Sequence, residues 1–145
     1  MGKAPIPAEL EPFVQAPRPA VVGTVRPDGT PATAATWYGW EDGHLVLSMV
    51  AKGARARNLH NQPGVSLTIL GESWYDHVTL LGRVVELRDD WRLVDLDQLS
   101  TRYTGDRYPK RELRCVTAIV AIERWHSWGD PAAQGSPPFS EGGPT

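Results

Sequence analysis

The chain has 145 residues, of which 41% are hydrophobic and 22% are charged, with a formal net charge of -2 and a pI near 6.1. This balance is typical of one soluble domain with a small core, and it argues against a general nucleic-acid-binding protein. The longest apolar runs are far too short to cross a membrane, so no membrane partner is expected.

The single cysteine, Cys115, lies in an apolar run, CVTAIVAI. It has no partner for an internal disulfide, and we expect it to be a buried, inert thiol. No segment combines the charged start, apolar middle and small-residue cleavage site of a signal peptide. These features predict a protein of the reducing cytoplasm.

Prolines at both ends set the expected limits of the domain. Residues 1–17 carry four prolines and indicate an N-terminal arm, with a short helical turn around residues 9–14. From residue 131 onward the sequence is rich in Pro, Gly, Ser and Ala, and such a composition buries too little apolar surface to order itself. We therefore expect a folded domain over residues 18–130, followed by a disordered tail over residues 131–145.

Within that domain the pattern is mostly that of β-strands. Short runs of β-branched and aromatic residues are separated by turn sequences, such as PDG at residues 27–29 and EDG at residues 41–43. Gly82 interrupts one run and predicts a bulge or a bend. The predicted strands cover residues 20–26, 33–40, 44–50, 65–70, 77–87 and 113–125.

Two helices complete the expected fold. Residues 53–61 predict a short helix that ends before Pro63. Asp89 and Asp90 offer N-cap oxygens to a second helix, in which leucines recur at helical spacing until Gly105. Six or more antiparallel strands with two to three short helices predict a mainly β fold, arranged as a closed or nearly closed barrel. A barrel this small has little interior space, so we expect a ligand on its outer wall, at a subunit boundary.

The stretch SMVAKGARARNL, residues 48–59, places three cations where a strand is predicted to turn into a helix: Lys52, Arg55 and Arg57. A helix start presents unpaired N–H groups and the positive end of the dipole, so added cations there favour a phosphate site. Residues two apart do not share a helix face, so Arg55 and Arg57 cannot both point at one phosphate. A solvated basic face on a surface helix explains the same residues equally well.

Polar and aromatic residues on the neighbouring strands extend this candidate site. Ser48 can donate to the same anion or simply face outward, and Thr36 and Trp37 can line the adjoining wall. The six tryptophans suit either stacking on a planar ring or a large dimer interface. No His or Cys spacing indicates a metal site, and no nucleophile or phosphate-loop motif is present. If the chain is an enzyme, a bound cofactor is expected to carry the chemistry.

The order of these features is similar to that of a known family. The chain resembles the pyridoxamine 5'-phosphate oxidase-like split β-barrel family. The resemblance rests on the run from AVVGTVRPDGTP to VSLTIL, followed in order by GRVVEL, a helix and the closing VAIERWHSWG. Within this family, the chain resembles the branch that uses the deazaflavin coenzyme F420. The resemblance covers residues 18–129. It implies an FMN-binding-protein-like split barrel and a homodimer, with two cofactor sites in the clefts between the subunits.

The resemblance also implies cofactor contacts by position. The implied residues are Thr36 and Trp37 along the ring, Ser48, Arg55, Arg57 and Asn58 at the phosphate, Lys52 in the same loop, and Tyr75 and His77 from the partner subunit. The family usually has a lysine where this chain has Arg55, and Lys52 is a candidate to replace it. Relatives often have a hydroxyl residue and then proline before the strand aromatic, whereas this chain has Ala35 and Thr36 before Trp37.

The function implied by the resemblance is hydride transfer between F420 and a small or conjugated organic substrate, with no catalytic side chain assigned. An FMN-dependent oxidoreductase on the same fold is the first alternative. A non-catalytic protein that binds flavin, F420 or haem is the second.

Overall fold

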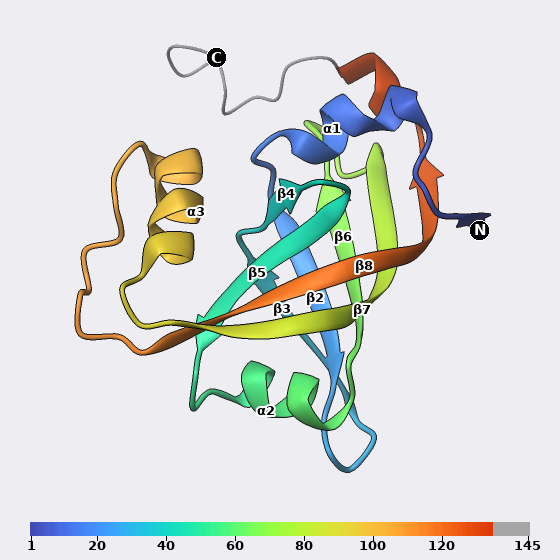
Figure 1. Ribbon diagram of the computed structural model, residues 1–145. Coiled ribbons are helices and arrows are strands. Elements are labelled where there is room, and N and C mark those ends of the chain that lie inside the picture. Colours follow the sequence, from blue (N-terminus) through green and yellow to red (C-terminus); the bar gives the residue numbers. More distant parts are fainter. Residues whose placement is uncertain (135–145) are drawn as a thin grey trace.

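The computed structural model describes residues 1–134 and is built around one curled antiparallel sheet with short helices at its ends and side (Figure 1). The strands are β1 (Gly2–Lys3), β2 (Ala20–Val25), β3 (Pro31–Thr36), β4 (Gly39–Glu41), β5 (His44–Val50), β6 (Gly64–Leu70), β7 (His77–Asp90) and β8 (Cys115–Trp128). The helical segments are η1 (Ala8–Leu10), α1 (Glu11–Gln15), α2 (Ala54–Asn61), α3 (Val94–Thr104) and η2 (Pro131–Gln134). In this part of the chain no helix is both long and apolar enough to cross a membrane.

The strands are hydrogen-bonded in the order β3-β2-β6-β7-β8-β5-β4, with β1 added on β8. Every pair is antiparallel, which confirms the predicted mainly β fold. The succession is not a plain meander, because β2 pairs with β6 and β5 pairs with β8. These two long-range pairings place α2, which follows β5, against both β5 and β2 at one end of the barrel.

The strands β7 and β8 are the longest and pair along most of their length. Their register shifts at Leu81/Gly82, so the bend predicted at Gly82 is confirmed. Gly82 lies so close to β8 that an added Cβ would be 2.4 Å from the carbonyl oxygen of Ala121. A glycine is therefore required at this bend.

The predicted strand over residues 33–40 is in fact two strands, because the chain turns inward at Tyr38. This side chain is fully buried, and its hydroxyl donates to the carbonyl oxygens of Val14 and Ala16 at 2.8 and 2.7 Å. Burial raises the pKa of the Tyr38 hydroxyl, which therefore stays protonated and remains a donor. The strand β3 consequently ends at Thr36, and β4 begins at Gly39.

The helix α3 starts after Leu93, which adopts the left-handed conformation with φ 61°. The capping oxygens come from Asp90, whose carboxylate accepts the N–H groups of Asp95 and Leu96 at 3.1 and 3.0 Å. The capping role predicted for Asp90 is thus confirmed. The predicted stop is confirmed as well, because Gly105 ends the helix with φ 88°.

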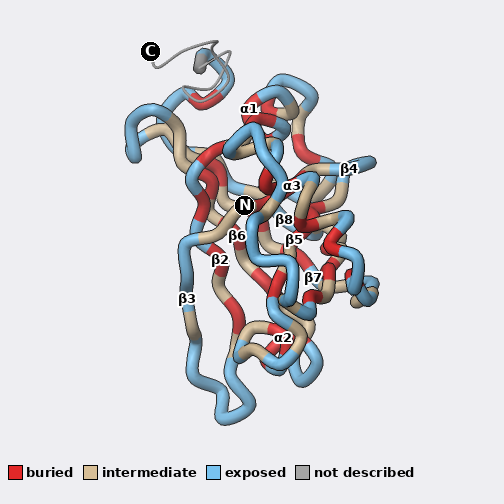
Figure 2. The backbone as a smooth tube through the Cα atoms, turned by 90° about the vertical axis from the view of Figure 1, so that its left-hand side faces the viewer, coloured by how far each residue is buried: buried red, intermediate tan, exposed pale blue. Residues whose placement is uncertain are grey.

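The core lies inside the curled sheet and is made by alternate residues of its strands. In β6 the side chains of Val65, Leu67 and Ile69 are buried, while the residues between them are half-buried. Figure 2 shows that β3, by contrast, is exposed or half-buried along its length. The strand β3 is thus an outer strand whose side chains remain available for another surface.

The N-terminal segment is part of the core. Leu10, Phe13 and Val14 are at most 5% exposed and pack against the sheet. The predicted helical turn is present as η1 and α1. The segment η2 packs against α1 and contains the buried Pro131, so ordered structure extends beyond the boundary expected at residue 130. Residues 135–145 of the predicted tail lie outside the described residues.

Candidate functional site

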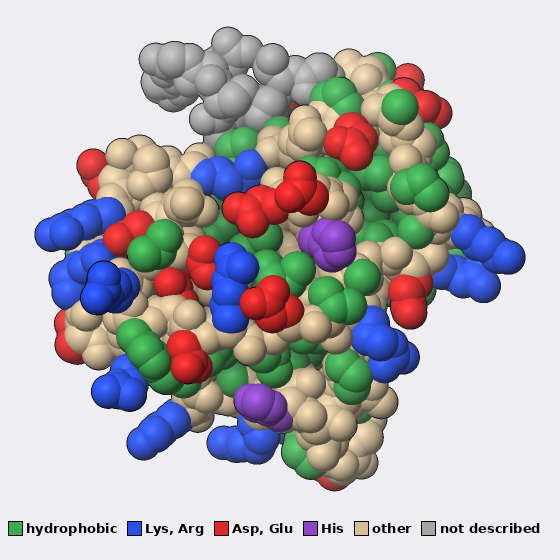
Figure 3. Space-filling view, in the orientation of Figure 1, with side chains coloured by type: hydrophobic (Ala, Val, Ile, Leu, Met, Phe, Trp, Pro, Cys, Tyr) green, Lys and Arg blue, Asp and Glu red, His purple; other side chains and the backbone are tan. Residues whose placement is uncertain are grey.

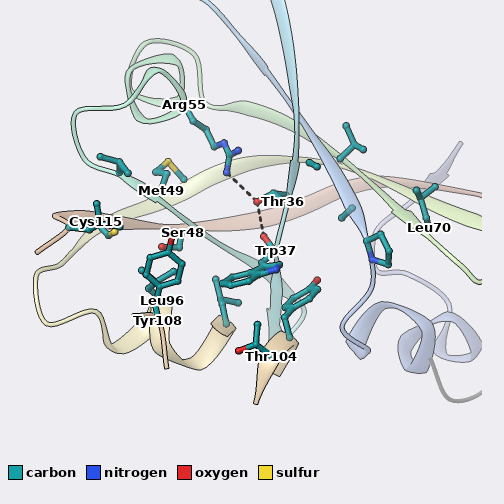
Figure 4. Close-up of a pocket in the computed structure, with 18 residues that line it drawn as sticks. Thr36, Trp37, Ser48, Met49, Arg55, Leu70, Leu96, Thr104, Tyr108 and Cys115 are labelled. Carbon is teal, nitrogen blue, oxygen red and sulfur yellow. Dashed lines mark hydrogen bonds between the residues drawn. The ribbon is translucent and has the colours of Figure 1, made fainter. Parts of the chain in front are cut away.

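A cavity of about 760 Å³ opens on the outer wall of the barrel, beside the ends of β2, β3 and β5 (Figure 4). The first turn of α2 borders one end of it, and α3 with the loop that follows borders the other. Most of its lining side chains are apolar, and its size is that of a cofactor or drug-sized ligand site. Four of the predicted site residues line it: Thr36, Trp37, Ser48 and Arg55.

Arg55 supplies the only formal charge among the lining residues. Its Nη1 donates to Thr36 Oγ1 at 3.2 Å, and the Thr36 hydroxyl donates to the Trp37 carbonyl oxygen at 2.9 Å. The guanidinium is half-buried, and its burial lowers the pKa of Arg55. No carboxylate pairs with Arg55 in the part of the chain that the structure describes. A partly desolvated cation without a counter-ion favours a bound anion.

The opposite end of the cavity is aromatic. Trp37 stacks on Tyr103 of α3, with ring centroids 5.5 Å apart and an interplanar angle of 16°. Tyr108 meets Trp37 edge-on, at 6.1 Å and 82°. The loop that carries Tyr108 is held by Asp97, whose carboxylate accepts the Tyr108 N–H at 3.1 Å and pairs with Arg111. This wall offers flat, apolar surface to a ring system.

The sequence interpretation missed the α3 side of this site. The residues of α3 were predicted only to recur on one helix face, yet Leu96, Leu99 and Tyr103 line the cavity. Their helical spacing was visible in the sequence, but nothing in it showed that the same face borders a cavity. Tyr108 carried no signal at all, because it lies in a polar loop.

Cys115 lies under α3 and lines the cavity with 2% of its surface exposed. The predicted burial of this thiol is therefore confirmed. Burial, and then the nearby Asp90 carboxylate, raise the pKa of the Cys115 thiol, while a hydrogen bond with Ser48 partly opposes them. The thiol is thus kept in its protonated, weakly nucleophilic form.

Three further predicted site residues of SMVAKGARARNL lie outside the cavity. Lys52 and Arg57 are exposed, and Asn58 is buried with its side-chain amide donating to Thr24 Oγ1 at 3.0 Å. Asn58 thus ties α2 to β2. Arg55 and Arg57 point to different sides of α2, as their spacing predicted. Figure 3 shows basic and acidic side chains interspersed over one face of the molecule, without a broad basic patch there.

The last two predicted site residues, Tyr75 and His77, also lie outside the cavity of their own chain. Tyr75 is 55% exposed and packs between Trp74 and Trp128, with centroid distances of 5.3 and 6.5 Å. His77 shares a hydrogen bond with the Trp74 carbonyl oxygen through Nδ1, at 3.0 Å. Their predicted role at the site of a partner subunit stays a prediction. Among the described residues, no group of three or more His, Cys, Asp or Glu side chains is placed to hold a metal ion.

The fold agrees with a comparison of the sequence against protein families. The sequence model for pyridoxamine 5'-phosphate oxidase matches residues 6–129, which is most of the chain. The chain belongs to this family. The fold is accordingly its split β-barrel, as the sequence predicted. A search of curated proteins finds no match.

Solved structures place the chain among several members of this fold. A protein described as an F420 reductase is 25% identical, with a TM-score of 0.77 over 83% of this chain and 98% of that one. A conserved hypothetical protein from Mycobacterium tuberculosis is 27% identical, with a TM-score of 0.69 over 97% and 94%. General Stress Protein 26 from Bacillus anthracis is 17% identical, with a TM-score of 0.65 over 83% and 91%, and shows the fold alone.

Proposed function

We propose that the chain is an F420-dependent oxidoreductase, which transfers hydride between the deazaflavin and a small or conjugated organic substrate. The observation that carries this proposal is Arg55, a half-buried cation without a carboxylate partner at one end of a large, mostly apolar cavity. The similarity to the F420 reductase supports the choice of cofactor.

The residues of the cavity fit such a cofactor in both chemistry and order. Arg55 would bind the phosphate, and the hydroxyls of Thr36 and Ser48 lie along the same strand ends. Trp37 and the tyrosines of the opposite wall would hold the ring system and exclude water. Bound F420 would supply a carbon centre that gives or accepts hydride. The protein contributes binding, orientation and an apolar surrounding.

The experiment that tests this function is a titration of the purified chain with F420 and with FMN at the same ionic strength. F420 fluorescence and FMN fluorescence report the two affinities directly. We expect F420 to bind at least about tenfold more tightly, a difference of about 1.4 kcal/mol. Oxidation of reduced F420 is then followed with a panel of electron-poor organic acceptors.

Binding of FMN but not F420 would instead support the FMN-dependent alternative. F420 binding without turnover of any acceptor would support a non-catalytic binding protein.

We further propose that the chain acts as a homodimer through the outer face of β2, β3, β6 and β7. On this outer sheet face Val21, Ala35, Thr68 and Thr79 neighbour one another across the strands, and Leu70 and Leu81 follow Thr68 and Thr79 two residues along β6 and β7. All of them are exposed or half-buried, and Thr68 and Thr79 share a hydrogen bond of 2.9 Å on this face. The face runs into the cavity, since Val21, Ala35 and Leu70 also line it. A second copy seated there would cover the cavity mouth.

The dimer is tested by Val21→Glu, which places a charge in the middle of the outer sheet face. Burying an unpaired carboxylate is costly, so we expect the variant to be monomeric at micromolar concentration, whereas the unaltered chain is a dimer by light scattering. The control is Val85→Glu, at the exposed, unpaired position of β7 where the register shifts between Val84 and Glu86, which should leave the mass unchanged. A monomeric unaltered chain would contradict the shared-cleft arrangement.

A further inference from the structure

The carboxyl-terminal end of α1 is held by three side chains, of which Arg18 is close in sequence and Tyr38 and Arg102 are distant. Helix ends leave carbonyl oxygens without partners, and here four consecutive ones are satisfied. Arg18 Nε donates to the Phe13 carbonyl oxygen at 3.0 Å, and the Tyr38 hydroxyl donates to those of Val14 and Ala16. Arg102 Nη1 donates to the Gln15 carbonyl oxygen between them. Cations suit this position, since it is the negative end of the helix dipole.

Arg102 is the residue that joins this end of α1 to α3. Besides Gln15, its guanidinium reaches the Tyr38 carbonyl oxygen, which accepts from Nε at 3.0 Å. The guanidinium carbon lies 5.2 Å from the ring centroid of Tyr38 and 5.8 Å from that of Tyr103. Arg102 therefore contacts the N-terminal segment and the β3–β4 connection at once.

The neighbouring Tyr103 carries this connection into the cavity. Its hydroxyl donates to the Arg18 carbonyl oxygen at 2.7 Å and accepts the Tyr38 N–H at 3.4 Å. Its ring stacks on Trp37 and lines the cavity. Arg102 itself is not among the lining residues. Any effect that it has on a ligand is therefore indirect and acts through lining residues of α3 such as Tyr103.

The other end of α3 is fixed separately. Asp90 caps its first N–H groups, and Arg88 forms two hydrogen bonds of 3.1 Å with Asp95, which also accepts the Thr117 hydroxyl at 2.7 Å. Loss of the Arg102 contacts would leave these bonds in place. Movement would then be confined to the carboxyl-terminal half of α3, where Leu99 and Tyr103 face the cavity.

We propose that Arg102 is a positioning residue, which fastens the cavity wall formed by α3 to the N-terminal segment and so controls access to the cavity. The cavity and its wall exist whichever cofactor binds. The proposal rests on the proposed function in one respect only, namely that the cavity bordered by this wall is the cofactor site. Residues 1–17 would then support the cavity wall through their contacts with Arg102, in addition to packing on the core.

The test measures how fast Cys115 reacts with a thiol reagent in the cofactor-free chain. This thiol is 2% exposed and is the only cysteine in the sequence. Trp37 packs against the cluster that contains Cys115 and stacks on Tyr103, so displacement of Tyr103 would loosen the cover of the thiol and raise its rate of reaction. Arg102→Met keeps an unbranched, flexible apolar stem and removes the guanidinium with its hydrogen bonds. We expect Arg102→Met to react at least about tenfold faster than the unaltered chain, with a rate that barely changes at low urea, because the opening is local. Arg102→Lys, which keeps the charge, should restore part of the protection.

Two controls separate local opening from general loss of stability. Arg83→Met changes an exposed arginine that forms a 3.8 Å ion pair with Glu123, and it should leave the Cys115 rate unchanged. Val65→Ala destabilises the core on β6, far from α3 in the sheet, and its thiol rate should rise steeply with urea. If Arg102→Met follows the same steep dependence, Arg102 is merely structural and the proposal is wrong. Because no cofactor is present, failure of F420 to bind would leave this result unaffected.

Discussion

Replacing Arg55 by alanine should weaken F420 binding by about 10- to 100-fold, measured by fluorescence titration at fixed ionic strength. A hydrogen bond to a charged group contributes about 1.5–3 kcal/mol, and a partly buried site is screened less than an exposed one. Arg55 is the charged residue that lines the cavity, and Thr36 already orients its guanidinium. The thermal midpoint should change little, because Arg55 forms no ion pair with the described residues.

The matched controls are Lys52→Ala and Arg57→Ala. Both remove a cation from the same short stretch, but both side chains are exposed and lie outside the cavity. Each should change the dissociation constant by less than about threefold, since exposed charges interact weakly through water. A larger loss in Lys52→Ala than in Arg55→Ala would show that Lys52 has taken over the phosphate. It would also overturn the assignment of the charged end of the cavity.

Replacing Phe13 by alanine should lower the free energy of unfolding by about 3–5 kcal/mol, which is a large fraction of the stability of a domain this size. Phe13 is 2% exposed, and the guanidinium of Arg18 lies 4.0 Å above its ring. Arg18 is itself fully buried, and burial lowers its pKa. Removing the ring would therefore leave both a void and a poorly packed charge. Urea unfolding followed by tryptophan fluorescence measures the change.

Glu9→Ala is the matching control for this segment, since Glu9 is exposed and acidic at the start of η1. It should alter the stability by less than about 0.5 kcal/mol. If Phe13→Ala is equally mild, the N-terminal segment contributes little to the core. The boundary expected at residue 18 would then be a true domain limit.

The strands were predictable because their ends are marked by local chemistry. The EDG turn fixes the start of β5, and the alternation of Val65, Leu67 and Ile69 identifies β6. The charged end of the cavity was also predictable, since Arg55 follows a strand and opens a helix. The local sequence does not show which of the three cations, Lys52, Arg55 or Arg57, is partly buried. That depends on the packing of Thr36, 19 residues away.

The rest of the site depends on contacts between residues far apart in the sequence. The hydroxyl of Tyr103 meets the Arg18 carbonyl oxygen across 85 residues, and Tyr38 reaches Val14 across 24. No periodicity within one segment encodes such pairs. The N-terminal segment was interpreted as an arm because its prolines break regular structure, although its apolar residues Leu10 and Phe13 are spaced for burial on one helical face.

The β7–β8 pair has a consequence for how the molecule unfolds. The strand β7 pairs with β6 and β8, while β8 also pairs with β5 and β1, so this long strand pair is shared by both halves of the sheet. Neither half can separate from the other without breaking hydrogen bonds of β7 or β8, and both halves depend on these two strands. Unfolding of the barrel should therefore be one cooperative transition, in which the outer helices can move while the sheet remains whole.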